Sequence, residues 1–195
     1  MSFPSWLLRG IAVASLAVLA ACSTGSDAVD QDSGGSLRFV AGSGASKFYE
    51  AGDRKQAPDI SGTLLDGGKF TLSQARGDVV VFNFWGSWCG PCRAEADDLE
   101  RVYTATKASG VRFVGVNVKD TESRAKAFDV NFKMSYPSLF DSAGRVALQL
   151  QAVPPNAVPA TIIIDRDGKI AAVFRKGLLD DELQPVVERV AAEKP

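Results

Sequence analysis

The sequence contains no histidine among its 195 residues. Histidine is the usual base of catalytic triads and a common metal ligand, so its absence excludes triads and histidine-assisted copper delivery. Basic residues are not in excess either, because 22 basic side chains stand against 23 acidic ones and no basic patch is present. Nucleic-acid binding depends on such a patch, so no nucleic-acid partner is expected.

Cysteine is scarce, with only Cys22, Cys89 and Cys92 in the chain. A structural zinc site takes four sulfur or imidazole ligands, which this chain does not supply, so no metal site is expected. A zinc half-site or an inert pair is the alternative for Cys89 and Cys92. Disulfides stabilise most when they close long loops, and a bridge across two residues closes almost none. We therefore interpret this pair as functional rather than structural.

The N-terminal apolar run is too short to cross a membrane. Arg9 precedes twelve apolar or small residues, 10–21, whereas a bilayer core needs about 20. A basic start, a short apolar run and small residues before a break predict an export signal. Leu19-Ala20-Ala21-Cys22 resembles a bacterial lipobox, in which the cysteine is lipidated and becomes the new N-terminus. Ordinary signal cleavage that leaves Cys22 as a free thiol is the alternative.

The chain therefore divides into a lipoprotein signal peptide over 1–21, a lipidated Cys22 with a flexible tether over 22–50, and one domain over 51–195. The tether is rich in Ser, Gly and Asp, a composition typical of disordered linkers. Its one apolar patch, residues 37–40, is interpreted as linker, with a first strand as the alternative. The predicted location is the extracytoplasmic face of a bacterial cell membrane, held there by the lipid anchor.

Trp88-Cys89-Gly90-Pro91-Cys92 follows the apolar run 79–84 and begins a helical pattern. A cysteine at the first turn of a helix faces unpaired N–H groups and the positive end of the helix dipole, and both favour the thiolate. The second cysteine lies one turn later, close enough to attack a mixed disulfide at the first. This arrangement predicts disulfide exchange between proteins.

Strand and helix patterns alternate along the rest of the chain. A hairpin over 59–72 is followed by buried strands at 79–84 and 111–118, with a helix from residue 93 to about 107 between them. Further elements are expected at 121–132 (helix), 138–140 (strand), 145–151 (short helix), 161–164 and 170–174 (strands joined by a turn) and from 180 (helix). This order predicts the α/β class with a central mixed sheet flanked by helices.

From about Ala57 to the C-terminus, the chain resembles a thioredoxin-fold protein of the membrane-tethered TlpA/ResA-like group. The residues that carry the resemblance are Ala57-Pro58-Asp59, the hairpin 64–69, Asn83-Phe84-Trp85, Trp88 to Arg93, and Val158-Pro159-Ala160-Thr161 before a strand. The resemblance implies a thioredoxin-like fold with an N-terminal β-hairpin and a central helix–strand insertion, here residues 123–132 and the strand after them.

The resemblance also implies roles for individual residues. Cys89 is the attacking thiol, exposed at the helix start, and Cys92 is the buried resolving thiol. Pro159 is a cis-proline beside the disulfide, and Val158 offers its backbone to an extended substrate segment; a proline that simply starts a strand is the alternative. Glu95 is implied near the active site, whereas a solvated helix-surface carboxylate is the alternative.

Further residues complete the expected substrate-binding surface or its surroundings. Trp88 is expected at the docking surface and Trp85 in the core, while Gly90-Pro91 resembles the sequence of reducing thioredoxins. Asn83 replaces the buried aspartate of cytosolic thioredoxins, as in TlpA/ResA relatives, and is expected to be satisfied by backbone groups. Glu95 then becomes the candidate for proton handling at Cys92.

The predicted activity is thiol-disulfide exchange that needs no cofactor beyond the redox-active Cys89–Cys92 disulfide. We expect a monomeric, tethered reductant of exported proteins, with apocytochrome c as a possible client and a membrane electron-transfer partner that recycles the site. A disulfide-forming oxidant and a non-catalytic client-binding module are the alternatives. The binding module differs from both the reductant and the oxidant, because disulfide exchange requires Cys89 and client binding does not.

Overall fold

The computed structural model describes residues 44–152 and 157–193. A six-stranded mixed sheet has the order β1-β8-β7-β4-β5-β6, and β2 and β3 form a separate hairpin. The strands are β1 (Ser46–Phe48), β2 (Ser61–Thr63), β3 (Lys69–Thr71), β4 (Val79–Trp85), β5 (Val111–Val118), β6 (Ser138–Asp141), β7 (Ala160–Ile164) and β8 (Ile170–Phe174). The helices are α1 (Gly90–Thr106), α2 (Glu122–Asn131), α3 (Arg145–Leu150) and α4 (Asp180–Ala192), with 3-10 turns at Ala51–Asp53, Leu72–Ala75 and Lys107–Ser109.

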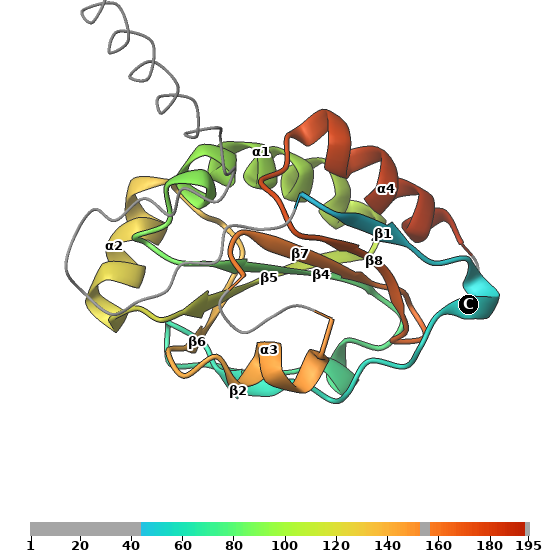
Figure 1. Cartoon of the computed structure of the whole chain (residues 1–195), viewed down its shortest axis with the longest axis horizontal. Helices are drawn as coiled ribbons and strands as arrows, with labels where there is room; N and C mark the ends of the chain where they lie inside the picture. Colours follow the sequence, from blue (N-terminus) through green and yellow to red (C-terminus); the bar gives the residue numbers. More distant parts are fainter. Residues whose placement is uncertain (1–43, 153–156, 194–195) are drawn as a thin grey trace, which may run out of the picture. The chain divides into compact units, whose positions relative to one another are not determined.

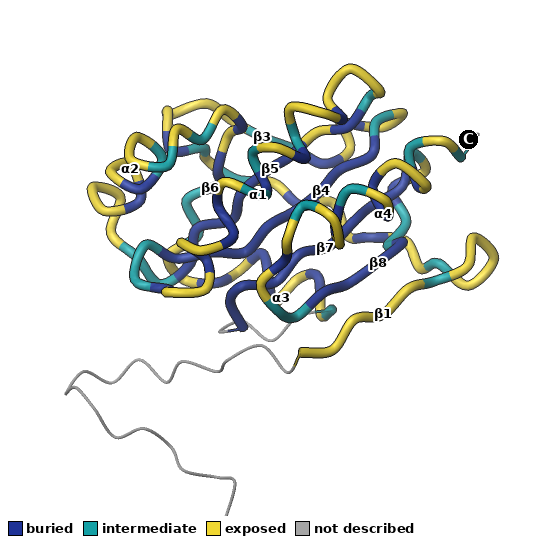
Figure 2. Tube along the Cα trace, turned by 90° about the horizontal axis from the view of Figure 1, so that it is seen from above, coloured by how far each residue is buried: buried dark blue, intermediate teal, exposed yellow. Residues whose placement is uncertain are grey.

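Helices α1 and α4 lie together on one face of the sheet, and α3 and the β2–β3 hairpin cover the other (Figure 1). The central strand β4 is buried along its whole length, as the sequence pattern predicted (Figure 2). Val79 and Val81 pack with the α1–α4 layer, whereas Val80 and Phe82 belong to the core of the opposite face. This two-residue alternation points Asn83 toward α1, which places a polar group beneath the active-site helix.

The predicted fold is confirmed: a thioredoxin-like α/β fold with a hairpin before the central sheet and an inserted helix and strand, α2 and β6. The hairpin docks through Leu65, whose N–H donates to the Ser138 carbonyl of β6 at 2.9 Å. Strands β4, β5 and β6 run parallel, and β7, β8 and β1 are added antiparallel to their neighbours. The loop after β4 therefore opens beside the loop before β7.

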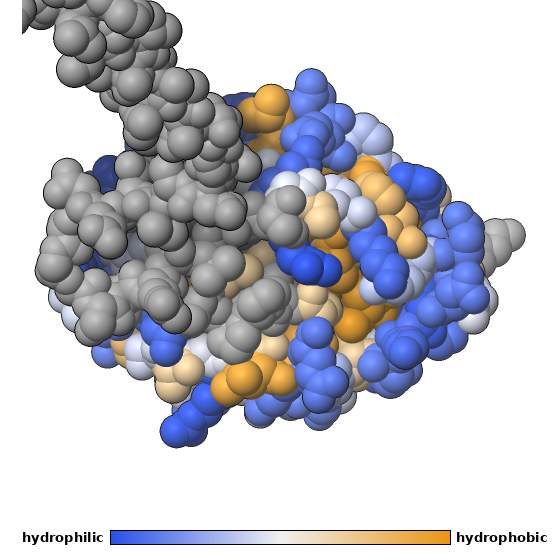
Figure 3. Space-filling model, in the orientation of Figure 1, coloured by the Kyte–Doolittle hydropathy of each residue, from blue (hydrophilic) through white to orange (hydrophobic). Residues whose placement is uncertain are grey.

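Strand β1 changes the expected domain boundary. Ser46–Phe48 was assigned to the tether that ends at residue 50, but it pairs with Phe174, Val173 and Ala172 of β8. Phe48 packs edge-on against Phe174, with the ring centroids 5.4 Å apart, although 52% of Phe48 stays exposed. Hydrophobic residues are visible at the surface near this β1–β8 edge (Figure 3). The sequence signal was missed because a three-residue strand with one large apolar residue has no readable period.

Residues 1–43 lie outside the described part of the chain, so the predicted signal peptide, Cys22 and the apolar patch at 37–40 stay predictions. Within 44–152 and 157–193, no helix is both long and apolar enough to span a membrane.

Arg54 joins the start of the domain to its last helix. Its Nη2 donates to Glu193 Oε1 at 2.8 Å and its Nη1 donates to Asp165 Oδ2 at 3.1 Å. The Arg54 and Asp165 side chains are only 6% and 10% exposed. Because Arg54→Ala removes the charged partner of the nearly buried Asp165 carboxylate, we expect the free energy of unfolding to fall by about 3 kcal/mol.

Denaturant unfolding of the oxidised protein measures this loss. Arg112→Ala is the matched control, because its pair with Asp78 involves an arginine side chain that is 58% exposed and should contribute less than about 1 kcal/mol. Equal losses in the two variants contradict the assignment of Arg54 as a buried ionic link.

Candidate active site

Cys89 and Cys92 lie where the sequence placed them, at the N-terminus of a helix that follows the central strand. Cys89 is the N-cap of α1, and its Sγ accepts a hydrogen bond from the Cys92 N–H at 3.2 Å. The two sulfurs are joined as a disulfide. Since free N–H groups and the helix dipole converge at this position, the arrangement stabilises a thiolate on Cys89 once the disulfide is reduced.

The expectation that Cys89 is exposed is wrong for this oxidised state. Cys89 is 1% exposed and Cys92 is 2% exposed. The bond to Cys92 turns the Cys89 sulfur toward the helix, and both residues belong to the apolar cluster that includes Ala157 and Val158. Gly90 and Pro91, between the cysteines, are exposed. A partner that docks here therefore meets the Gly90-Pro91 turn before it reaches sulfur.

The Val158–Pro159 peptide bond is cis, as the resemblance implied. Pro159 directly precedes β7, which pairs with β4, so the proline loop is held beside the start of α1. Gly177, after β8, is a third backbone element here: a Cβ on it would lie 3.9 Å from Pro159 Cγ and 3.9 Å from the Pro91 carbonyl oxygen. The sequence analysis missed Gly177, since a single glycine after a strand does not show which loop it faces.

Glu95 is buried rather than solvated, with 2% of the residue exposed. Its Oε1 accepts a hydrogen bond from Asn83 Nδ2 at 3.0 Å, and its Oε2 accepts one from the Leu178 N–H at 2.9 Å. Burial raises the pKa of Glu95 to about 7, the negative charge of Asp98 adds to the shift, and the two hydrogen bonds oppose it. A carboxyl group that exchanges a proton near neutral pH thus lies one helical turn from Cys92.

Asn83 differs from its expected role. Its side-chain amide does not pair with backbone groups; Nδ2 donates to Glu95 and, at 3.2 Å, to Thr161 Oγ1 of β7. Asn83 and Thr161 are opposite each other in the antiparallel β4–β7 pair. This register, which the sequence does not state, holds the Glu95 carboxylate in place.

Trp88 is half-buried, and Trp85 is in the core, as expected. The Trp88 indole Nε1 donates to the Lys119 carbonyl at 2.9 Å. Its ring lies over Gly86, where a Cβ would come within 2.7 Å of the indole, so Gly86 has to be glycine. Asp120 fixes the same loop by accepting hydrogen bonds from the N–H and hydroxyl groups of Ser87. These hydrogen bonds fix the conformation of the loop that leads from β4 to Cys89.

In the part of the chain that the structure describes, no group of three or more acidic or cysteine side chains is arranged to hold a metal ion.

The predicted catalytic and substrate-binding residues lie together in the structure: Trp88, Cys89, Gly90, Pro91, Cys92, Glu95, Val158 and Pro159. Cys22, the expected lipidation site, lies outside the described residues.

The comparisons with known proteins agree with this geometry. Residues 54–173 match the AhpC/TSA family. The thiol-disulfide oxidoreductase ResA of Bacillus anthracis is 32% identical over 136 residues, which cover 70% of this chain and 77% of that protein. ResA of Geobacillus kaustophilus is 30% identical over 134 residues, which cover 69% of this chain and 75% of that protein.

Two solved structures are also similar. A secreted thiol-disulfide isomerase from Corynebacterium glutamicum has a TM-score of 0.74 and 34% identity, over 82% of this chain and all of that one. A DsbF homologue from Corynebacterium diphtheriae has a TM-score of 0.71 and 34% identity, over 80% of this chain and 99% of that one. With the matched fold and sequence, the enzyme is a thiol-disulfide oxidoreductase that exchanges thiols and disulfides with protein substrates. The chain belongs to the AhpC/TSA family of thioredoxin-fold proteins and, within it, to the TlpA/ResA-like thiol-disulfide oxidoreductases.

Proposed function

We propose that this protein reduces disulfides of exported proteins through Cys89 and Cys92 while it is held at the outer face of the cell membrane. The observation that carries the proposal is the position of Cys89: it caps the N-terminus of α1, one turn before Cys92 and beside the cis Val158–Pro159 bond. This arrangement provides an activated sulfur, a second sulfur that releases it, and a backbone edge for a substrate segment.

The exchange begins with the reduced enzyme. The Cys89 thiolate attacks one sulfur of the substrate disulfide, and the second substrate sulfur leaves as a thiolate that takes up a proton. Cys92 then loses its proton, and its thiolate attacks the Cys89 sulfur of the mixed disulfide. The Cys89–Cys92 bond forms, the first substrate sulfur leaves and is protonated, and two electrons with two protons have passed to the substrate. Glu95, buried one turn from Cys92, accepts the Cys92 proton.

The extracytoplasmic location is supported by the export signal and the lipobox-like Leu19-Ala20-Ala21-Cys22, and by the secreted relative from Corynebacterium glutamicum. A lipid on Cys22 tethers the domain to the membrane. Because such a reductant is oxidised at each turnover, it needs a membrane electron donor that reduces Cys89–Cys92 again. No metal or organic cofactor enters the chemistry.

Apocytochrome c is the client that the ResA relationship favours. Its two haem-binding thiols have to be reduced before haem can attach, and a Cys-Gly-Pro-Cys reductant supplies the two electrons. The alternative is an oxidant that installs or rearranges disulfides, and it is favoured by one observation: a structurally similar relative is a thiol-disulfide isomerase.

The reduction potential of the Cys89–Cys92 pair separates the two directions. We expect a value near about −270 mV, like that of thioredoxin, whereas an oxidant of the DsbA type lies near about −120 mV. Equilibration of the full-length protein with glutathione or dithiothreitol buffers, followed by thiol alkylation and mass measurement, gives the potential. Failure of the reduced protein to open the disulfide of an apocytochrome c Cys-x-x-Cys-His peptide, at a potential that permits it, contradicts this choice of client.

A further inference from the structure

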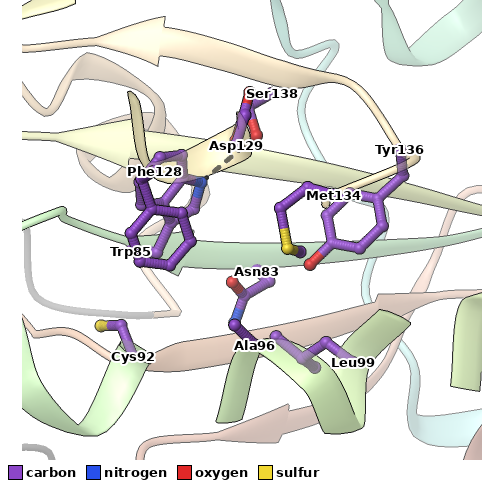
Figure 4. A pocket seen from close by; sticks show the side chains of 10 residues that line it. All are labelled: Asn83, Trp85, Cys92, Ala96, Leu99, Phe128, Asp129, Met134, Tyr136 and Ser138. Carbon is purple, nitrogen blue, oxygen red and sulfur yellow. Dashed lines mark hydrogen bonds between the residues drawn. The ribbon is translucent and has the colours of Figure 1, made fainter. Parts of the chain in front are cut away.

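A small cavity lies inside the domain beside the resolving cysteine, between α1, β4 and the segment that runs from α2 to β6 (Figure 4). Its volume is about 10 Å³, room for about one water molecule. Cys92 forms part of its wall, and Asn83, Asp129, Tyr136 and Ser138 supply polar side chains around it. Such a polar lining is what a single buried water requires.

Asp129 is the unusual member of this wall. It lies in the last turn of α2, and its Oδ1 is buried without a hydrogen-bond partner among the described residues. Burial raises the pKa of Asp129 to about 6, so the carboxyl group is still ionised at neutral pH. An ionised oxygen with no protein donor needs water, and the cavity that it borders has room for one.

Among the described residues that line the cavity, Asp129 is the one with a formal charge. Tyr136 is buried, and burial together with the negative charges of Glu95, Glu100 and Asp129 raises its pKa well above the ordinary value. Asp98 acts on Glu95 in the same sense. None of the described residues that line the cavity carries a positive charge. Asp129 and Glu95 thus both act on Tyr136, and Tyr136 and Cys92 line the same cavity.

We propose that Asp129 is a positioning residue for the resolving thiol: its carboxylate, hydrated by one water in the cavity, disfavours the ionised form of Cys92 in the reduced enzyme. A second negative charge in a poorly hydrated space costs free energy, so Cys92 loses its proton less readily while Asp129 is ionised. The step is a proton transfer from the Cys92 thiol to Glu95, and no electrons move until the thiolate attacks Cys89. This inference rests on the proposed role of Cys92 as the resolving thiol.

Asp129→Asn tests the proposal, because it removes the charge and keeps the size and the capacity to bind water. The pKa of Cys92 is measured in the reduced full-length protein from ¹³C-labelled cysteine signals against pH. We expect it to fall by about one unit, since a like charge in a partly buried site has effects of this order. The lower pKa gives about tenfold more Cys92 thiolate at pH 7, but a more acidic thiol is also a weaker nucleophile. The net result should be that Cys92 resolves a mixed disulfide about threefold faster.

Asp97→Asn is the matched control, because Asp97 is exposed on α1 and lies closer to Cys92 in sequence. This control should leave the Cys92 titration unchanged. The same Cys92 pKa in Asp129→Asn and the parent protein overturns the proposal.

If Asp129→Asn does not fold, the parent protein still decides the question. The ¹³Cγ signal of Asp129 in the reduced enzyme should show a second inflection at the pH where Cys92 ionises, because coupled groups report each other's titration. One inflection alone overturns the proposal. Both measurements are titrations, so a protein without exchange activity can still confirm the coupling, and an active protein can still refute it.

Discussion

Cys89→Ala is expected to abolish disulfide exchange, with a loss of at least about a thousandfold in the rate at which the protein reduces insulin or an apocytochrome c peptide. The sulfur at the α1 N-cap is the nucleophile, and Cys92, the other thiol of the site, lies inside the helix without this N-cap position. Cys92→Ala should instead stop the reaction after its first half and accumulate a covalent complex, because the resolving sulfur is missing.

Two measurements check this pair of outcomes. Steady-state exchange with the purified full-length protein gives the rates, and mass spectrometry of the Cys92→Ala complexes gives the clients. Cys22→Ser is the matched control: it removes a cysteine outside the pair and should exchange at the parent rate. An intact cellular function in Cys89→Ala supports a non-catalytic client-binding module and contradicts the exchange mechanism.

The same variants also address the buried state of Cys89. In the disulfide form Cys89 is 1% exposed. A partner can therefore reach the Cys89 sulfur only if the surrounding side chains move when the partner docks. In Cys92→Ala the Cys89 thiol is free of its bond and should react with iodoacetamide at neutral pH. A Cys89 thiol that stays unreactive up to pH 9 contradicts a role as attacking group.

Glu95→Gln is expected to change how stability depends on pH. The ordinary glutamate pKa is 4.5, and burial raises that of Glu95 to about 7 in the folded protein. Between these values the unfolded chain has lost the proton and the folded protein has kept it. The stability that the protonated carboxyl contributes is therefore complete below pH 4.5, falls as the pH rises, and is lost above pH 7.

The size of this effect is about 3 kcal/mol for a shift of this magnitude in a fully buried group. We expect the free energy of unfolding of Glu95→Gln, relative to the parent, to rise by about 3 kcal/mol from pH 4 to pH 8. The comparison cancels the other titrating groups. It also cancels the pH-independent cost of turning Asn83 so that its carbonyl accepts from the new amide while Leu178 still donates.

Denaturant unfolding of the oxidised protein at several pH values measures the difference. Glu122→Gln, an exposed glutamate of α2 paired with Lys126, is the matched control and should differ from the parent by less than about 0.5 kcal/mol at every pH. A Glu95→Gln difference that is constant with pH shows that this carboxyl titrates at its ordinary value. The pH profile of exchange should lose its inflection near 7 in the same variant.

The chemistry and the order of elements were readable from the sequence, because their signals act over a few residues. The run 79–84 predicted β4, the helical pattern that follows the two cysteines predicted a helix N-terminus at this site, and Asp-Gly turns predicted the hairpins. The resemblance then implied the cis bond at Pro159, which the structure has. The boundaries of the elements were predicted less well. Helix α1 begins at Gly90 rather than at residue 93, and the domain includes β1, which has too few apolar residues to give a strand pattern.

Only the tertiary structure decided which groups surround the two sulfurs. Leu178 lies 83 positions from Glu95 and Thr161 lies 78 from Asn83, and no local pattern links such pairs. The sequence likewise left Glu95 between a surface and a site role, assigned backbone partners to Asn83, and gave no signal for Asp129. Burial and partnership are fixed by how the sheet is ordered and how α1, α2 and α4 pack on it. The sequence by itself therefore predicted the reaction, because the cysteine motif is local. The environment of the two cysteines and of Glu95 depends on contacts between distant segments, and only the folded structure decided it.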